Sequence, residues 1–477
     1  MSSRSTSRPL GHSRSNGRLA RRHRVAWHKP ASTPHPSAPL QPPNWVGPLA
    51  LGLGFAGLIF VVLLAVSQIN FAALHSVDAI ANALGRVCGL LGTYAMFIMV
   101  VLIARIPALE RIIGQDRLVR WHRTIGGWPI GLIAVHIASV TIGYAHLTNV
   151  SVFSQFITFV LHYPDILAAL VGFLLLVMAG VSSHHSARRK MRYETWWSVH
   201  LYLYLGLGFA VAHQVTTGAM FIHNSLLSAL WVGSWMCLGL VALACRLGLP
   251  LIGTLRHQLR VAEIELVAPG VTAVTLVGKR LDELAISGGQ FFQWRFLQRG
   301  LWSHSHPYSV SAMPRPPYLR VTVKGLGDQS TAVRALTVGT RVFIEGPYGT
   351  FTRQAARTNS MVLFGAGVGV TPLRALLEDL PTTASVTVVV RGSNVADLVH
   401  REELVSLCAA RGAAYHEVIG PRSQNVLDAR WLKSIAPNAA RSDFYLCGPK
   451  GFTESIEQSA RRLKVPRSQI HVESFEL

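Results

Sequence analysis

The chain has 477 residues, of which 50% are hydrophobic and 14% are charged, and its mean hydropathy is +0.34. This composition is too apolar for a soluble enzyme and far from that of a disordered chain. The formal net charge of +22 alone would suit a nucleic-acid-binding protein. Much of the positive excess, however, lies in residues 1–44 and between apolar stretches, as in cytoplasmic segments that face anionic lipid. We therefore expect membrane lipid, and no nucleic acid, among its partners.

Six apolar stretches within residues 45–247 are long enough to cross a bilayer. They lie at 45–69, 85–108, 121–147, 164–183, 196–216 and 225–247. The arm at 1–44 is rich in Arg, Ser and Pro, contains no acidic residue and is expected to be disordered and cytosolic. Its length and polarity argue against a cleaved signal peptide. The five cysteines show no CxxC spacing, so neither a zinc site nor a disulfide framework is indicated.

The loops between these stretches predict the orientation in the membrane. Basic residues gather at 105–123 and 188–192, whereas 71–82, 148–163 and 215–225 contain no Lys or Arg. Since positive loops stay in the cytoplasm, both termini should be cytoplasmic and the protein should be a multi-pass protein of the cell membrane.

The second half reads as two soluble domains. Short alternating runs separated by Gly and Pro turns predict a small antiparallel β-barrel over residues 250–354. From residue 358 to 477 strands alternate with helical stretches, which predicts an α/β domain with a parallel sheet. The expected fold class is therefore multi-domain: an all-α six-helix transmembrane domain, an antiparallel β-barrel and a parallel α/β domain.

Two of the apolar stretches each carry a pair of histidines. His122 and His136 are 14 residues apart, and His200 and His213 are 13 apart, which is about 20 Å along a helix. Intramembrane histidine is costly without a partner, so it indicates function. Two stacked pairs of imidazoles, His122 with His200 and His136 with His213, suit two six-coordinate b-type haems.

The alternative for these histidines is hydrogen bonding between helices or a proton path. One detail of the haem interpretation is awkward, because 13 residues miss the same helix face by about 140°. The fifth stretch must then be tilted, be locally rewound, or present the two haems on different flanks.

The β-barrel region contains a candidate flavin site in the stretch SHSHPYSVSA. An aromatic ring can lie against a flavin while a neighbouring hydroxyl meets its N5 atom. Glycines and hydroxyls further on allow close approach to a pyrophosphate. The candidate residues are His306, Pro307, Tyr308, Ser309, Lys324, Gly325, Ser330 and Thr331. The first four could equally form an ordinary strand.

The stretch VLFGAGVGVTP, at 362–372, reads as a strand, a glycine-rich turn and a helix start. Glycines let the backbone approach a phosphate, Thr can cap the helix and Pro suits its first turn. A later stretch, FYLCGPKGF, places a cysteine at the end of a strand before a turn. The candidate nucleotide-binding residues are Gly365, Gly367, Gly369, Thr371, Pro372, Cys447, Gly448 and Pro449. Each alone could reflect packing, but their order is specific.

Together these motifs resemble the ferric reductase and NADPH oxidase superfamily over roughly residues 45–477. Its members combine six spans and bis-histidyl haems with a ferredoxin–NADP reductase-like module for FAD and NAD(P)H. The histidine pairs resemble its haem ligands, HPYS resembles its HPF[ST] flavin motif with Tyr308 in place of Phe, and GAGVGVTP and CGP resemble its nucleotide motifs.

The resemblance assigns roles to further residues. Glu473 and Phe475 are similar to the terminal acidic and aromatic residues that approach the flavin, although Leu477 ends this chain. Arg391 and Arg401 lie where related reductases bind the 2′-phosphate of NADPH. Arg86 resembles an arginine that superoxide-forming oxidases place beside the outer haem; the alternative is an interfacial arginine. The histidine that those oxidases carry one turn beyond the outer ligand is Val140 here.

We therefore expect a transmembrane NAD(P)H oxidoreductase that passes electrons through FAD and two b-type haems to an external acceptor. Cys447, Glu473, Phe475 and Arg86 are its candidate catalytic residues. Ferric iron is the favoured acceptor, and oxygen, giving a superoxide-forming oxidase, is the alternative. A nucleotide-gated channel or transporter, and a subunit that hands electrons to a membrane partner, remain open at this point.

Overall fold

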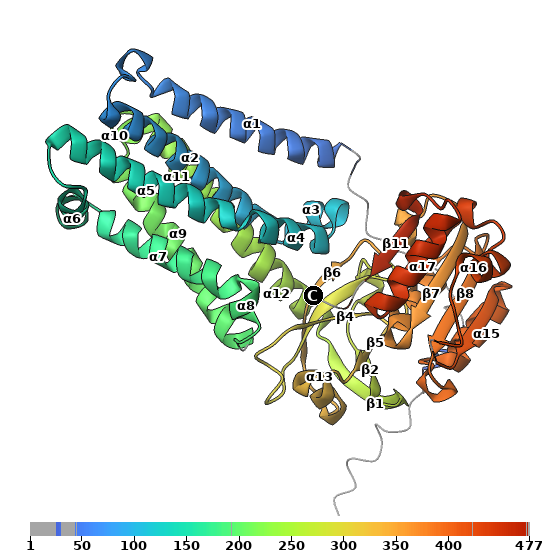
Figure 1. The fold of residues 1–477 in the computed structure, drawn as a ribbon. Coiled ribbons are helices and arrows are strands. Elements are labelled where there is room, and N and C mark those ends of the chain that lie inside the picture. Colours follow the sequence, from blue (N-terminus) through green and yellow to red (C-terminus); the bar gives the residue numbers. More distant parts are fainter. Residues whose placement is uncertain are drawn as a thin grey trace, which may run out of the picture.

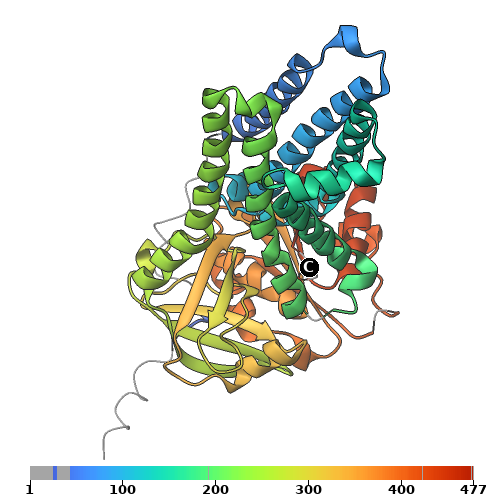
Figure 2. The same ribbon diagram turned by 90° about the vertical axis from the view of Figure 1, so that its left-hand side faces the viewer.

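The computed structural model describes residues 25–29, 43, 45–191, 193–421, 423–473 and 475. Most of the arm predicted over residues 1–44 lies outside the described residues. The described part divides into a bundle of long helices and a C-terminal half of strands and shorter helices (Figure 1). Figure 2 shows the helices standing on one side of the β-strands.

The helical half is built almost entirely from α-helices. These are α1 (Val46–Ser67), α2 (Val77–Ile103), α3 (Pro107–Ile113), α4 (Gln115–Ile125), α5 (Gly127–Thr148), α6 (Val152–His162), α7 (Ile166–Ser183), α8 (His185–Arg188), α9 (Tyr193–Thr217), α10 (Ala219–Ile222), α11 (Ser225–Leu243) and α12 (Leu249–His257). Helix α2 begins eight residues before the predicted stretch at 85, since Asp78 in its first turn suits the positive end of the helix dipole.

Among the described residues, five helical runs are long and apolar enough to cross a membrane. They are Val46–Ser67, Val77–Ile103, Gln115–Thr148, Ile166–Ser183 and Ser225–His257. The remaining predicted stretch, 196–216, is helical as α9, but its histidines, tryptophans and tyrosines lower its hydropathy and it is not among the five. A sixth span at α9 stays a prediction.

Glycines allow two helix pairs to approach closely. A Cβ atom at Gly172 in α7 would lie 2.7 Å from the carbonyl oxygen of Gly206 in α9. A Cβ atom at Gly85 in α2 would lie 2.5 Å from a methyl group of Val140 in α5. Small residues are the usual means of close helix packing in membranes. These contacts fix α2 against α5 and α7 against α9, the helices that carry three of the four predicted haem ligands.

The last long helix runs further than the sequence suggested. Helix α11 continues through a π-helical turn, Ala244–Gly248, into α12, which ends at His257. Pro250 lies in the first turn of α12, where its missing N–H costs little, and the wider π-turn precedes it. The helical half therefore ends beyond residues 247–250, because a proline at that position does not stop a helix.

The β domain comprises β1 (Arg260–Ala268), β2 (Val271–Val277), β3 (Phe291–Phe296), β4 (His306–Ser309), β5 (Tyr318–Lys324), helix α13 (Asp328–Ala332) and β6 (Val342–Tyr348). The strands form two antiparallel three-stranded sheets, β1-β2-β5 and β4-β3-β6. Single bridges, Arg260–Arg341 and Val310–Val321, connect the two sheets. One apolar core with Trp294 and Phe292 fills the space between them.

The parallel-sheet domain follows with β7 (Ser360–Ala366), α14 (Val370–Asp379), β8 (Ser385–Gly392), α15 (Arg401–Arg411), β9 (Ala414–Ile419), α16 (Ala429–Ile435), β10 (Asp443–Cys447), α17 (Lys450–Arg462) and β11 (Ile470–Glu473). All strands are parallel in the order β11-β10-β7-β8-β9. Leu363 and Phe364, neighbours in β7, belong to separate cores on the two faces. A sheet covered on both faces offers its binding site at the carboxyl ends of its strands.

Candidate functional site

All four intramembrane histidines line one cavity of about 1460 Å³ within the helical bundle. His122 lies in α4, His136 in α5, and His200 and His213 in α9. The volume exceeds the roughly 300–1,000 Å³ of pockets that hold one drug-sized ligand. The space is therefore large enough for more than one small prosthetic group.

The rings of His122 and His200 are neighbours, with centroids 6.4 Å apart and ring planes inclined at 60°. Two imidazoles that bind one metal ion from opposite sides at about 2 Å each have centroids about 6 Å apart. The Nδ1 atom of His122 lies 3.2 Å from the Met99 carbonyl oxygen, to which it donates. His200 is flanked by Ser183, 3.5 Å from its Nδ1, and by the Trp196 ring at 4.9 Å. The pair fits a bis-histidyl haem, with Nε2 of His122 left as the ligand atom.

The second pair, His136 and His213, is held differently. The Nδ1–H group of His136 donates to the Gly85 carbonyl oxygen at 2.7 Å, which leaves Nε2 unprotonated. A Cβ atom at Gly89 would lie 2.7 Å from Nδ1 of His136, so only glycine leaves room for this ring orientation. Nδ1 of His213 is buried and has no hydrogen-bond partner among the described residues. Both histidines line the cavity, and helix α9 is α-helical throughout, without the local rewinding considered from its 13-residue spacing.

Arg86 and Val140 line the same cavity as His136. Nη1 of Arg86 donates to the Gln68 carbonyl oxygen at 3.4 Å. Gln68 and Asn82 also line this end, and the Asn82 Oδ1 atom is buried without a hydrogen-bond partner among the described residues. Arg86 therefore borders the same cavity as His136 and His213, in an environment with polar side chains.

The predicted flavin motif forms strand β4, which pairs with β3. The Trp294 indole donates to the Tyr308 carbonyl oxygen at 2.7 Å, and the His306 and Tyr308 rings stack with centroids 5.9 Å apart. Nε2 of His306, the hydroxyl of Tyr308 and the hydroxyl of Ser309 are buried and have no hydrogen-bond partner within the described structure. Burial raises the pKa of the Tyr308 phenol, which keeps it protonated as a donor. Three unpaired polar atoms on one strand fit a polar cofactor such as FAD.

The second flavin-related segment is a turn between β5 and α13. Lys324 ends β5 and is exposed. The Ser330 hydroxyl accepts hydrogen bonds from the backbone of Leu326 at 2.9 Å and of Gly327 at 3.0 Å. A Cβ atom at Gly325 would lie 2.9 Å from the hydroxyl oxygen of Thr331, so the turn closes tightly on that side chain.

The glycine-rich turn joins β7 to α14 as expected from VLFGAGVGVTP. Thr371 donates to the Val368 carbonyl oxygen at 2.8 Å, and both Thr371 and Pro372 are buried in α14. A Cβ atom at Gly369 would lie 2.3 Å from the Cys447 carbonyl oxygen. The CGP motif, with Gly448, therefore packs directly on this turn.

A cleft of about 450 Å³ lies between the β domain and the parallel-sheet domain. The predicted residues Lys324, Gly367, Arg391 and Pro449 all line it, although they come from four different segments. The Arg391 guanidinium donates to the carbonyl oxygens of Gly392, Val418 (3.0 Å) and Gly420. Arg401 does not line the cleft and pairs with Glu417 at 2.7 Å. The cleft suits a nucleotide, but Arg391 is largely engaged with the backbone.

Cys447 meets two other predicted residues at the carboxyl edge of the sheet. In the parallel register Cys447 lies opposite Gly365 of β7 and opposite Glu473 of β11. Cys447 is fully buried and Glu473 is 7% exposed. Phe475 follows β11 with 40% of its surface exposed. The pairing of β11 with β10, which the sequence did not predict, thus places Glu473 beside the CGP motif.

Glu473 gives a pH prediction. Burial, with a smaller contribution from the Asp116 carboxylate of α4, raises its pKa to about 8. The folded state therefore retains a proton that the unfolded state releases above about pH 4.5. We expect the unfolding free energy to fall by up to about 1.4 kcal/mol per pH unit from this group as pH rises toward 8, and then to level off.

The measurement is thermal unfolding of the detergent-solubilised protein between pH 6 and 9. Glu473→Gln should flatten the dependence, whereas Glu457→Gln on the exposed face of α17 should leave it unchanged. An identical slope in Glu473→Gln and the unaltered protein would contradict the assignment.

Comparison with known protein families finds relatives of the helical half. Residues 88–211 match the family described as ferric reductase like transmembrane component. Dual oxidase 1 of Rattus norvegicus is 26% identical over 315 residues, which cover 58% of this chain and 19% of that protein. The chain is therefore a multi-pass membrane protein.

Comparisons of the C-terminal half give a second group of relatives. The flavohemoprotein of Chromobacterium violaceum is 31% identical over 203 residues, covering 36% of this chain and 49% of that protein. The FAD/NAD-binding domain of nitric oxide dioxygenase from Vibrio cholerae has a TM-score of 0.39 and 23% identity, over 46% of this chain and 98% of that domain. The chain spans about half the length of the flavohemoproteins and less of the dual oxidases. Residues 88–211 thus resemble a ferric reductase-like transmembrane component, and the C-terminal half resembles part of the flavohemoproteins.

Proposed function

We propose that the protein is a transmembrane NAD(P)H oxidoreductase. Electrons pass from NAD(P)H in the cytoplasm through FAD and two b-type haems to an acceptor on the opposite side of the membrane. The observation that carries the proposal is the neighbouring pair His122 and His200, whose ring centroids are 6.4 Å apart inside a cavity that also contains His136 and His213. Four histidines in one intramembrane cavity disfavour the channel or transporter alternative.

Each prosthetic group has a set of residues that would hold it. His122 with His200, and His136 with His213, would each ligate one haem, while His306, Tyr308 and Ser309 would bind FAD. When bound, FAD accepts two electrons as a hydride and passes them singly to haem, which is one-electron chemistry. The protein orients the groups that would hold these cofactors. The Met99 and Gly85 carbonyl oxygens orient His122 and His136, and the Trp294 indole fixes the backbone of β4.

The nucleotide would bind in the cleft that Gly367 and Pro449 line, with Cys447 at the end of the adjoining strand. We propose NADPH as the preferred nucleotide, with Arg391 reaching the 2′-phosphate after exchanging part of its backbone contacts. NADPH should then be used more efficiently than NADH, and Arg391→Ala should remove the difference. Equal catalytic efficiency with both nucleotides in the unaltered protein would refute this preference.

We propose ferric iron as the external acceptor. A bis-histidyl haem has no free coordination position, so an acceptor must take its electron at the haem edge. Arg86 supplies a positive charge that would stabilise nascent superoxide, but Val140 stands where the oxidases carry their second polar group. A ferric chelate would need only to come close to the haem that His136 and His213 would hold.

The test follows ferrous iron and superoxide together in detergent-solubilised protein supplied with NADPH. We expect ferrous iron to account for most electrons, and Arg86→Ala to slow chelate reduction by less than about tenfold, since it removes only an attracting charge. Arg120→Ala, exposed on α4, is the matched control. If superoxide accounts for nearly all electrons and Arg86→Ala abolishes it, the protein is an oxidase. A purified protein without a Soret band would leave the channel or transporter as the better explanation.

A further inference from the structure

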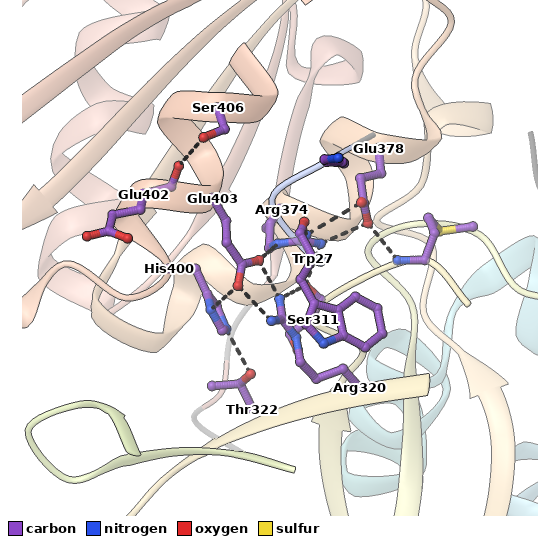
Figure 3. Close-up of polar contacts among 12 residues, drawn as sticks. Trp27, Ser311, Arg320, Thr322, Arg374, Glu378, His400, Glu402, Glu403 and Ser406 are labelled. Atoms are coloured by element: carbon purple, nitrogen blue, oxygen red, sulfur yellow. Dashed lines mark hydrogen bonds and ion pairs between the residues drawn. The ribbon is translucent and has the colours of Figure 1, made fainter. Parts of the chain in front are cut away.

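A buried polar cluster joins the β domain to the parallel-sheet domain (Figure 3). Arg320 of β5 donates to both carboxylate oxygens of Glu403 of α15, each at 2.7 Å. Arg374 of α14 also donates to Glu403 and pairs with Glu378 at 2.8 Å. The Arg320 and Arg374 side chains are 2% and 0% exposed. Buried guanidinium groups are tolerated only when their N–H groups are paired, so this cluster depends on a complete set of acceptors.

Part of that set comes from the N-terminal arm. The Trp27 carbonyl oxygen accepts a hydrogen bond from Nη2 of Arg374 at 2.6 Å. The Trp27 ring lies over the guanidinium carbon of Arg320, at 4.7 Å, and over that of Arg315, at 5.1 Å. Trp27 is only 8% exposed, although it lies in a basic and otherwise polar arm. An aromatic ring within about 6 Å of a guanidinium group is a favourable cation–π arrangement.

The backbone on both sides of Trp27 is held as well. Arg315, in the loop before β5, donates to the carbonyl oxygens of Ala26 and Lys29 and pairs with Glu378. Three arginines in this cluster face two carboxylates, so N–H donors remain after the ion pairs are made. Carbonyl oxygens of a peptide can accept from these donors without adding charge. The three arginines therefore favour an aromatic residue whose neighbouring carbonyl oxygens can accept hydrogen bonds.

The arginines that contact Trp27 lie between the two domains that would bind the flavin and the nucleotide. The flavin candidates lie on β4 of one domain, and Cys447 lies on β10 of the other. The distance between them depends on the angle between the domains. Trp27 contacts Arg320 from the first domain and Arg374 from the second, so the arm segment connects both. Displacement by about 1 Å at a reacting centre can cost about a hundredfold in rate.

We infer that Val25–Lys29 is a docked strap that holds the β domain and the parallel-sheet domain in the orientation required for hydride transfer. Trp27 is thus a positioning residue that touches neither cofactor site. The inference rests on the proposed function, in which a hydride leaves NAD(P)H, which is oxidised, and reduces FAD. It gives a role to five residues of an arm that the sequence alone predicted to be disordered.

The test compares Trp27→Ala, Trp27→Phe and His28→Ala in the full-length, flavin-loaded protein. Mixing with NADPH should reduce the flavin about tenfold more slowly in Trp27→Ala, with nucleotide affinity and flavin content unchanged. Trp27→Phe should restore most of the rate, because it keeps a ring over the arginines. His28 is exposed, so His28→Ala should behave like the unaltered protein. Amide hydrogen exchange over residues 311–324 and 370–379 should rise in Trp27→Ala alone.

Unchanged flavin reduction and unchanged exchange in Trp27→Ala would overturn the inference. So would equal slowing in Trp27→Phe or in His28→Ala, because the ring would then not be the cause. If NADPH fails to reduce the flavin of the unaltered protein, the proposed function fails. The exchange measurement still decides whether the strap holds the two domains in that case.

Discussion

Replacement of His122 by alanine is expected to abolish NADPH-driven reduction of an external acceptor while leaving reduction of the flavin intact. The rings of His122 and His200 have centroids 6.4 Å apart, so the substitution would remove one of the two residues that would hold one haem. Loss of a partner that merely orients a ligand costs about 10–100-fold in metal affinity, and loss of the ligand should exceed that. We expect the acceptor rate to fall more than about 100-fold.

The measurement combines haem content from the pyridine haemochrome with flavin and acceptor kinetics. Unaltered protein should contain two low-spin haems per chain, and His122→Ala should contain one. His146→Ala is the matched control, because His146 lies on α5, is exposed and does not line the cavity. One haem per unaltered chain, or a normal haem content in His122→Ala, would refute the ligand assignment.

Cys447→Ala is expected to slow hydride transfer to the flavin by about 10–100-fold while the nucleotide dissociation constant changes little. Cys447 ends β10, lies opposite Gly365 and Glu473, and its carbonyl oxygen faces Gly369. Its side chain is fully buried at the carboxyl end of β10, beside the turn that carries Gly369. Its loss would therefore affect orientation of the nicotinamide more than total binding energy.

Stopped-flow reduction of the flavin at several NADPH concentrations separates the two quantities. Cys408→Ala provides the control, since Cys408 is about as buried and belongs to the same apolar core, but lies in α15 and not at the end of β10. A change in apparent affinity alone for Cys447→Ala would show that the cysteine is a packing residue. Equal slowing in both variants would point to general loss of stability.

Sequence patterns predicted the elements that depend on local chemistry. Hydropathy located the apolar helices because each must cover about 30 Å of hydrocarbon with its own side chains. The β7–turn–α14 motif was recognisable because glycines and a helix-start proline act on their immediate neighbours. Helix ends were less predictable: Pro250 suggested a boundary, yet the π-turn before it lets the helix continue to His257.

Contacts between distant segments could not be predicted in the same way. The sequence could not predict that the Gly85 carbonyl oxygen orients His136, because every residue has a carbonyl group. Arg391 was expected at a phosphate, but its guanidinium donates to three backbone carbonyls. Trp27 lies in a basic arm without periodicity, and only the arrangement of Arg315, Arg320 and Arg374 shows why an aromatic residue is there.

The sequence by itself determined which residue types are available and how far apart they lie along each helix or strand. It thereby placed two imidazoles on one predicted membrane stretch and two on another, and hydroxyl and aromatic groups on one strand. The tertiary structure alone decided that the Gly85 carbonyl oxygen orients His136 and that Cys447 lies opposite Glu473. The reason is physical: spacing within an element follows from fixed backbone geometry, whereas pairing between elements depends on how whole surfaces pack.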